Sequence, residues 1–148
     1  MTYRFAGFLC PSRVERPASL PPGVVWREIS EPFVGVGVRI EELVGKSPQV
    51  EEVDRFADAL KIKTSPAWLY LTYDCWAGEV DFVYGLGFSN GKAFGSLKER
   101  LDDDVFGPLR EESEASARDI FIQLMARIGL TPEQAMRFPP FERGFWGE

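Results

Sequence analysis

The 148-residue chain contains no histidine. This absence excludes Ser-His and Cys-His activation of a nucleophile, two-histidine phosphodiesterase chemistry and every zinc motif that uses a histidine. Because there are only two cysteines, Cys10 and Cys75, a structural zinc site is not expected either. Any catalysis would rely on carboxylates, lysine, tyrosine or a cation with oxygen ligands. We therefore expect a protein that is not an enzyme and that holds no metal or cofactor.

Basic residues and long apolar runs are also scarce. The chain has 17 Lys and Arg against 23 Asp and Glu, a net charge of −6, which argues against a nucleic-acid partner. No apolar stretch approaches the ~20 residues that a membrane-spanning helix needs. The first residues enter a strand-like pattern without the features of a secretion signal. We expect no membrane partner and a cytoplasmic protein whose cysteines stay reduced.

What the chain does contain is enough apolar material for a packed core, since 45% of its residues are hydrophobic and 14% are aromatic. Its length suits one domain over residues 1–148. Apolar periodicity and turn residues predict strands at 3–10, 24–29, 33–40, 67–76, 79–88 and 92–94, and helices at 48–60 and 111–128, with a short last helix after Thr131.

These elements predict a single α+β domain. Its antiparallel sheet is built from two hairpins plus an N-terminal strand, and two main helices cover the sheet. Ser47 and Pro48 are typical of the first turn of a helix, and Gly129 is typical of a helix C-terminus. We expect both main helices to cover the same face of the sheet.

The hairpin at residues 67–88 is the most informative segment, because its two faces differ chemically. A turn at Ala77-Gly78 pairs Cys75 with Val80 and Tyr73 with Phe82, which makes one face apolar throughout. The same register makes a second face that mixes aromatics, glycines and carboxylates, with the pairs Trp76–Glu79, Asp74–Asp81, Thr72–Val83, Tyr70–Gly85 and Trp68–Gly87.

Asp74 and Asp81 stand directly opposite each other in this register. Opposed carboxylates repel, which raises one pKa or recruits a cation or an arginine. Three interpretations stay open: a cation or catalytic site, a structural ion pair with Arg39 or with an arginine from a helix, or a pair at a solvated strand end.

Glycines alternate along two strands, at Gly35 and Gly37 and at Gly85 and Gly87. Glycine inside a strand weakens it, so such positions often mark the close approach of a helix, a ligand or a second backbone. Neither run opens a helix, so neither is a nucleotide-binding motif. We expect tight packing within the chain.

The C-terminal segment from Phe138 to Trp146 is rich in aromatic residues. It either straps across the domain and buries its own rings or supplies aromatic anchors to another chain.

The second face of the hairpin is the candidate binding surface. Acidic groups around aromatic anchors suit a basic protein partner, because charge speeds the encounter and the buried rings supply affinity. We expect a non-catalytic protein-binding module, most concretely a small bacterial immunity or inhibitor protein that neutralises a basic toxin domain. The alternative is a small-molecule-binding domain or a carboxylate-dependent enzyme that uses the same face. The candidate partner-binding residues are Trp68, Tyr70, Asp74, Trp76, Glu79 and Asp81.

Overall fold

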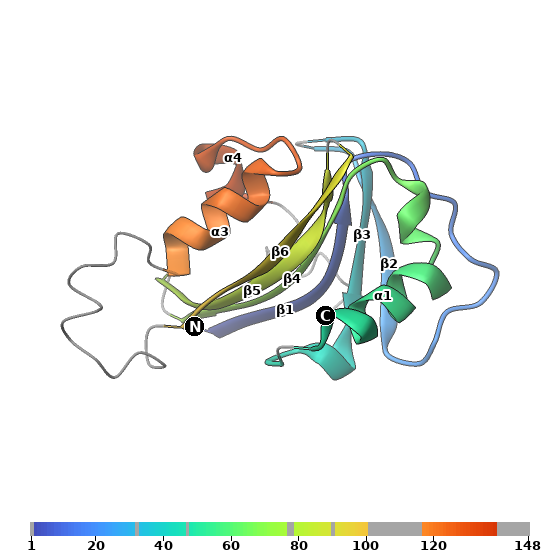
Figure 1. Cartoon of the computed structure of the whole chain (residues 1–148), viewed down its shortest axis with the longest axis horizontal. Helices are drawn as coiled ribbons and strands as arrows, with labels where there is room; N and C mark the ends of the chain where they lie inside the picture. The colour runs from blue at the N-terminus through green and yellow to red at the C-terminus, as the bar shows by residue number, and fades with distance from the viewer. Residues whose placement is uncertain are drawn as a thin grey trace.

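The fold is organised around one antiparallel sheet with the N-terminal strand near its middle (Figure 1). The computed structural model describes residues 2–31, 33–46, 48–76, 79–89, 91–100 and 117–138. Within them the strand order is β2-β3-β1-β4-β5-β6. The expected α+β class is confirmed, with a hairpin on either side of β1. The strands are β1 (Thr2–Cys10), β2 (Val24–Ile29), β3 (Gly35–Ile40), β4 (Trp68–Trp76), β5 (Glu79–Ser89) and β6 (Lys92–Arg100).

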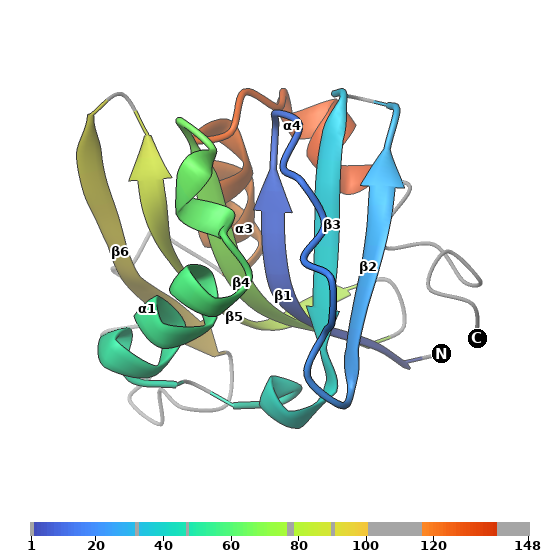
Figure 2. The same ribbon diagram turned by 90° about the vertical axis from the view of Figure 1, so that its right-hand side faces the viewer.

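Helices lie on both faces of the sheet. The sheet curves around α3 (Ala117–Ala126) and α4 (Pro132–Met136), whereas α1 (Val50–Ala59) packs on the outer face with the short 3₁₀ helix η2 (Ile62–Thr64) (Figures 1 and 2). A second short 3₁₀ helix, η1 (Glu41–Leu43), follows β3 directly. The expectation that both main helices share one face is therefore wrong.

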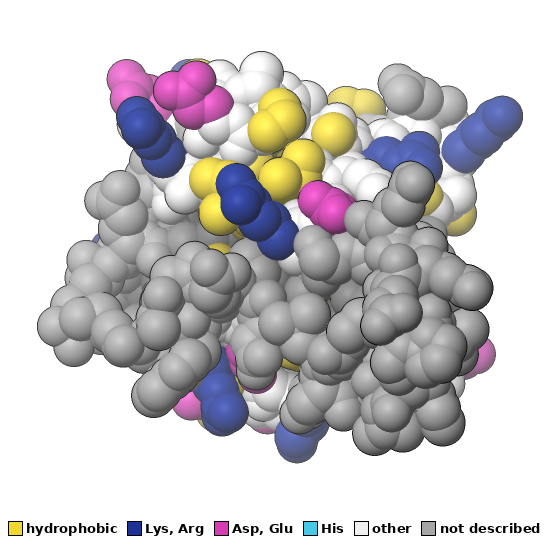
Figure 3. All heavy atoms as spheres, turned by 90° about the vertical axis from the view of Figure 1, so that its left-hand side faces the viewer, with side chains coloured by type: hydrophobic (Ala, Val, Ile, Leu, Met, Phe, Trp, Pro, Cys, Tyr) yellow, Lys and Arg dark blue, Asp and Glu magenta, His cyan; other side chains and the backbone are white. Residues whose placement is uncertain are grey.

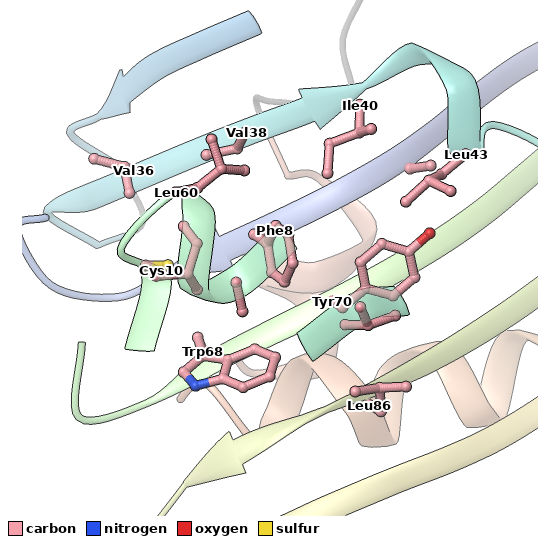
Figure 4. Packing of buried hydrophobic residues seen from close by; sticks show 14 of the residues in the cluster. Phe8, Cys10, Val36, Val38, Ile40, Leu43, Leu60, Trp68, Tyr70 and Leu86 are labelled. Atoms are coloured by element: carbon pink, nitrogen blue, oxygen red, sulfur yellow. The ribbon is translucent and has the colours of Figure 1, made fainter. Parts of the chain in front are cut away.

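The reason is that the central strands are apolar on both sides. In β1, Phe5 and Leu9 contribute to an inner core under α3 and α4, while Phe8 and Cys10 contribute to an outer core under α1. Figure 4 shows the outer core, in which Phe8, Trp68, Tyr70 and Leu86 project from neighbouring strands. A helix on one face alone would leave the other row of side chains in water, at a cost of roughly 1.5–3 kcal/mol for each large side chain.

The register of the long hairpin contains a bulge that the sequence pattern does not reveal. Near the turn the expected pairs form, since Trp76 lies opposite Glu79 and Cys75 opposite Val80. The register then skips Asp81, and Asp74 lies opposite Phe82. The predicted Asp74–Asp81 pair is therefore wrong, because one extra residue in β5 places Phe82 and not Asp81 opposite Asp74.

The bulge also exchanges the faces of β5. Val83 joins the inner core, whereas Phe82, Tyr84 and Leu86 join the outer core beside Tyr70. The predicted apolar face of β4 is correct, since Leu69, Leu71 and Tyr73 all lie in the inner core. A shift by one residue moves every later side chain of a strand to the other face.

Some of the predicted helix caps and element ends are found in the structure, and others differ from it. Thr131 caps α4 in a capping box with Gln134, and Gly129 has a φ of +91° after α3. Helix α1 begins at Val50 after Gln49, so Pro48 lies outside the helix. Strand β3 begins at Gly35, and β6 continues to Arg100, beyond the predicted 92–94. Ser47, residues 111–116 of the predicted helix and residues 139–148 of the tail lie outside the described residues.

The glycines of β5 mark close packing within the chain, as the sequence predicts. A Cβ on Gly85 would lie 2.6 Å from Leu124 Cδ1 of α3. A Cβ on Gly87 would lie 2.1 Å from the backbone oxygen of Trp68. The first neighbour is the end of a flexible side chain, and the second is backbone of the adjacent strand.

This difference predicts unequal costs for two alanine substitutions in one strand. We expect Gly87→Ala to lower the free energy of unfolding by about 1–3 kcal/mol, because strand backbone must move to relieve the overlap. Gly85→Ala should cost less than half as much, because Leu124 can rotate away and alanine restricts the unfolded chain. Urea unfolding of both variants measures this difference, and equal losses would contradict the assignment.

Candidate functional site

A half-open cleft of about 620 Å³ lies on the outer face, between α1, η2 and the β5–β6 end of the sheet. We call it the α1 cleft. In Figure 2 these elements lie on the left of the molecule. Its lining residues are Val50, Asp54, Lys63, Trp68, Leu86, Gly87, Phe88, Ala93 and Phe94. This volume and mainly apolar lining are typical of protein sites that bind small molecules or single anchoring side chains.

The floor of the α1 cleft is made by the starts of β4 and β6 and the end of β5. Trp68 is held by an edge-to-face contact with Phe8, with ring centroids 5.8 Å apart, and its side chain lies near Leu86 (Figure 4). Phe88 lies opposite Trp68 in the β4–β5 register and opposite Ala93 in the β5–β6 register. Because Trp68 is 93% buried by its own fold, the floor is formed before any ligand binds.

The rim of the α1 cleft is charged. Val50 and Asp54 lie one turn apart on α1, and Val50 is 50% exposed. Lys63 from η2 places its Nζ 2.5 Å from Asp54 Oδ1 and 3.2 Å from Asp58 Oδ1. The hydrogen bond with Asp54, supported by Asp58, raises the pKa of Lys63. The lysine therefore stays charged at neutral pH and does not act as an amine nucleophile.

The other titratable groups of the outer core are also held in their protonated forms. Burial raises the pKa of Tyr70, whose hydroxyl shares a 2.7 Å hydrogen bond with Thr72, and also that of Tyr84, which donates to the Pro48 carbonyl oxygen. Burial raises the pKa of Cys10 to about 12. None of these groups offers a base or a thiolate at neutral pH.

The expected binding surface on the hairpin is not assembled as the sequence predicts. Tyr70 is fully buried and Trp68 is only 7% exposed, so the prediction that both rings face outward is wrong. The bulge is the reason, because it puts Phe82, Tyr84 and Leu86 on their side of the sheet, where α1 covers them. The side chains of Trp76, Glu79 and Asp81 lie outside the described residues.

Asp74 has a different partner from the one expected. Its carboxylate lies 3.8 Å from Arg4 Nε, across the β1–β4 pair, and its side chain is 13% exposed. Arg39, the arginine named from the sequence, pairs with Glu41 instead. The sequence held no signal for Arg4, because the pairing of β1 with β4 brings together residues 70 positions apart and follows from no local turn.

In its described part, the face opposite to that of Figure 2 carries a small group of hydrophobic side chains near its upper centre. Figure 3 shows charged side chains of both signs among a few hydrophobic ones. Within the described residues, no group of three or more acidic, cysteine or histidine side chains is placed to hold a metal ion. Among the same residues, no helix is long and apolar enough to cross a membrane.

The chain was compared with protein-family models, with curated proteins and with solved structures, and none of the three comparisons found a match.

The buried thiol predicts a pH dependence of stability. The pKa of Cys10 is about 12 in the folded chain and 9.0 without the fold, so its contribution is complete below pH 9 and is lost as the pH rises toward 12. Between about pH 9 and pH 10, the wild type should lose about 1 kcal/mol of unfolding free energy more than Cys10→Ala loses. Urea unfolding at the two pH values measures this, and parallel losses would show that the thiol ionises equally in both states.

Proposed function

We propose that this protein is a non-catalytic binding module of the inhibitor or immunity type. In this proposal the α1 cleft receives an apolar side chain of a basic protein partner, and the acidic surface of α1 contacts the basic groups around it. The observation that carries the proposal is a preformed cleft with an aromatic floor, bordered by Asp54 of α1, a helix that carries three further carboxylates.

The geometry favours an anchoring side chain. The floor is rigid, since Trp68 belongs to the outer core, and the opening is bordered by Val50 and Asp54 of α1. Binding energy at protein interfaces concentrates in a few apolar or aromatic anchors that enter pockets of this kind. A preformed pocket also reduces the entropy lost when a ligand binds.

Charge around the cleft favours a basic partner. Glu51 and Asp58 lie one turn before and one turn after Asp54 on α1, and all three are exposed. Helix α1 carries four carboxylates and one arginine, a net charge of −3, and the two lysines that follow it leave this region negative. A negative surface on a chain of net charge −6 accelerates the approach of a cationic protein and disfavours an anionic one.

The chemistry of the nearby groups favours recognition over catalysis. Lys63 stays charged, and burial keeps Tyr70, Tyr84 and Cys10 protonated. We place the encounter in the cytoplasm, where the free thiols Cys10 and Cys75 remain reduced.

A small molecule is the second candidate ligand, and one observation favours it. The cleft volume of about 620 Å³ lies within the ~300–1,000 Å³ typical of small-molecule pockets. Asp54 and Lys63 at the rim pair with each other, so the mainly apolar lining would favour a neutral compound with an aromatic body.

Short peptides around one tryptophan test the proposal. We expect Lys-Lys-Trp-Lys-Lys to shift the amide resonances of Val50, Asp54 and Phe88 in ¹⁵N–¹H spectra of the full chain. The same peptide with serine in place of tryptophan, or with glutamate in place of lysine, should bind at least tenfold more weakly, because each lacks either the anchor or the charge. Free indole, titrated in parallel, reports the small-molecule alternative.

A matched pair of valine substitutions locates the site. Val50 and Val34 are both about half exposed, but only Val50 borders the α1 cleft. Val50→Trp should fill the cleft and weaken the lysine–tryptophan peptide at least tenfold, whereas Val34→Trp should leave it unchanged. Equal effects of the two variants would refute the site. Tight binding of indole with no preference among the peptides would replace the protein partner by a small molecule.

A further inference from the structure

A second hollow lies at the other end of the sheet and has the opposite chemistry. It measures about 1,090 Å³ and is bordered by the loop that follows β1, by β2 and by the chain that enters β3. Figure 2 shows this loop crossing in front of β3. Arg13 and Arg16 come from the loop and Arg27 comes from β2, so we call this hollow the arginine groove.

The loop is fixed in place, although it contains no regular structure. Val14 is buried in the outer core, while its neighbours Arg13, Glu15 and Arg16 are exposed. Pro17 restricts the backbone of Arg16 to extended conformations. The packing of one valine and the stiffness of one proline thus hold the backbone of Arg13 and Arg16 at the border of the groove.

The three arginines are free to bind an anion. Within the described part of the chain, none of them forms an ion pair, whereas Arg4, Arg39 and Arg137 each contact a carboxylate. Guanidinium groups bind carboxylates and phosphates through two parallel hydrogen bonds, which makes unpaired arginines around a groove typical of anion recognition.

The remaining lining residues narrow the class of anion. Glu15 and Glu28 also border the groove and would repel a dense polyanion such as a phosphate cluster or a nucleic acid. Trp26 and Val36 line it as well, and so does Val34, which is 55% exposed. This mixture suits an extended chain whose carboxylates are spaced apart by apolar residues. β2, the last strand of the described sheet at this end, offers an extended backbone beside such a chain.

We infer that the arginine groove binds an extended acidic segment of a protein partner. Its carboxylates pair with Arg13 and Arg16, and an apolar side chain between them packs against Trp26 and Val34. This site is separate from the α1 cleft, since the two hollows share no lining residue and lie at opposite ends of the strand order.

Fluorescence anisotropy with a labelled peptide, Thr-Glu-Val-Glu-Val-Glu-Thr, tests this inference on the full chain. We expect saturable binding that weakens as the ionic strength rises from about 0.05 to about 0.3 M, because salt screens exposed charges. The peptide with lysine in place of glutamate should not bind. In methyl-labelled protein, Val34 and Val36 should shift on binding, whereas Val50 in the α1 cleft should not.

Matched arginine variants separate the groove from total charge. Arg13→Gln/Arg16→Gln should weaken the acidic peptide at least tenfold, and Arg118→Gln/Arg137→Gln, which removes the same charge from α3 and the end of α4, should change it less than twofold. All four residues are exposed, and thermal unfolding of each variant checks its fold. Equal weakening by both pairs would overturn the inference. Displacement of the peptide by an equal concentration of inorganic phosphate would overturn it in favour of a general anion site, and self-association of the wild type that Arg13→Gln/Arg16→Gln abolishes would assign the groove to a second copy of the chain.

Discussion

The structure depends on one constraint: the central strands carry large apolar side chains on both faces. Each face of β1, β4 and β5 must therefore be covered, and the chain does this with α3 and α4 on the inner face and α1 on the outer face.

A ten-residue helix such as α1 is about 15 Å long, whereas six strands span about 24 Å between the axes of the outer two. Even if it lay straight across the strands, α1 would not cover the whole outer face. The α1 cleft and the arginine groove lie on either side of the part that α1 covers. Both candidate sites therefore exist because α1 is too short to cover the whole outer face.

The bulge at Asp81 determines which side chains of β5 lie on the outer face, which α1 covers only in part. Without it, Phe82, Tyr84 and Leu86 would extend the inner core, and the outer face of β5 would carry Asp81, Val83 and two glycines. With it, the outer core gains three large side chains, and Leu86 becomes part of the floor of the α1 cleft beside Trp68. The bulge also removes the predicted Asp74–Asp81 register pair, in which directly opposed like charges would destabilise the strands, since Phe82 lies opposite Asp74. A single extra residue thus changes a predicted acidic surface into a second hydrophobic core.

The parts of the fold that the sequence predicts are those coded by neighbouring residues. The strands alternate with period two, Gly129 ends α3 with a positive φ, and Thr131 caps α4. The register beyond Asp81 was not predictable in this way, because Phe82-Val83-Tyr84 offers an apolar side chain to either face and no turn residue marks the bulge. The candidate site shows the same division. The sequence predicts Trp68 on a binding surface, but the structure buries most of its ring, and the residues that line the cleft with it, Val50, Lys63 and Phe88, come from three other elements. The pairing of Arg4 with Asp74 likewise depends on a non-local strand contact.

Acidic and basic side chains occupy different regions of the molecule, which the net charge alone does not show. A value of −6 suggests a uniformly acidic protein, but the structure separates the acidic residues of α1 from the unpaired arginines of the β1–β2 loop and β2. Two regions of opposite sign thus lie at opposite ends of the strand order, so the charge is distributed asymmetrically along the sheet. In the proposed function, a partner with its own charge asymmetry is turned into one orientation before contact, because the field acts over a Debye length of about 8 Å at physiological salt. The buried tyrosines, the buried thiol and the paired lysine all have raised pKa values, so these four groups stay protonated at neutral pH. In the proposed function, the separated charges set the orientation of a partner, and the apolar hollows beside them supply the affinity.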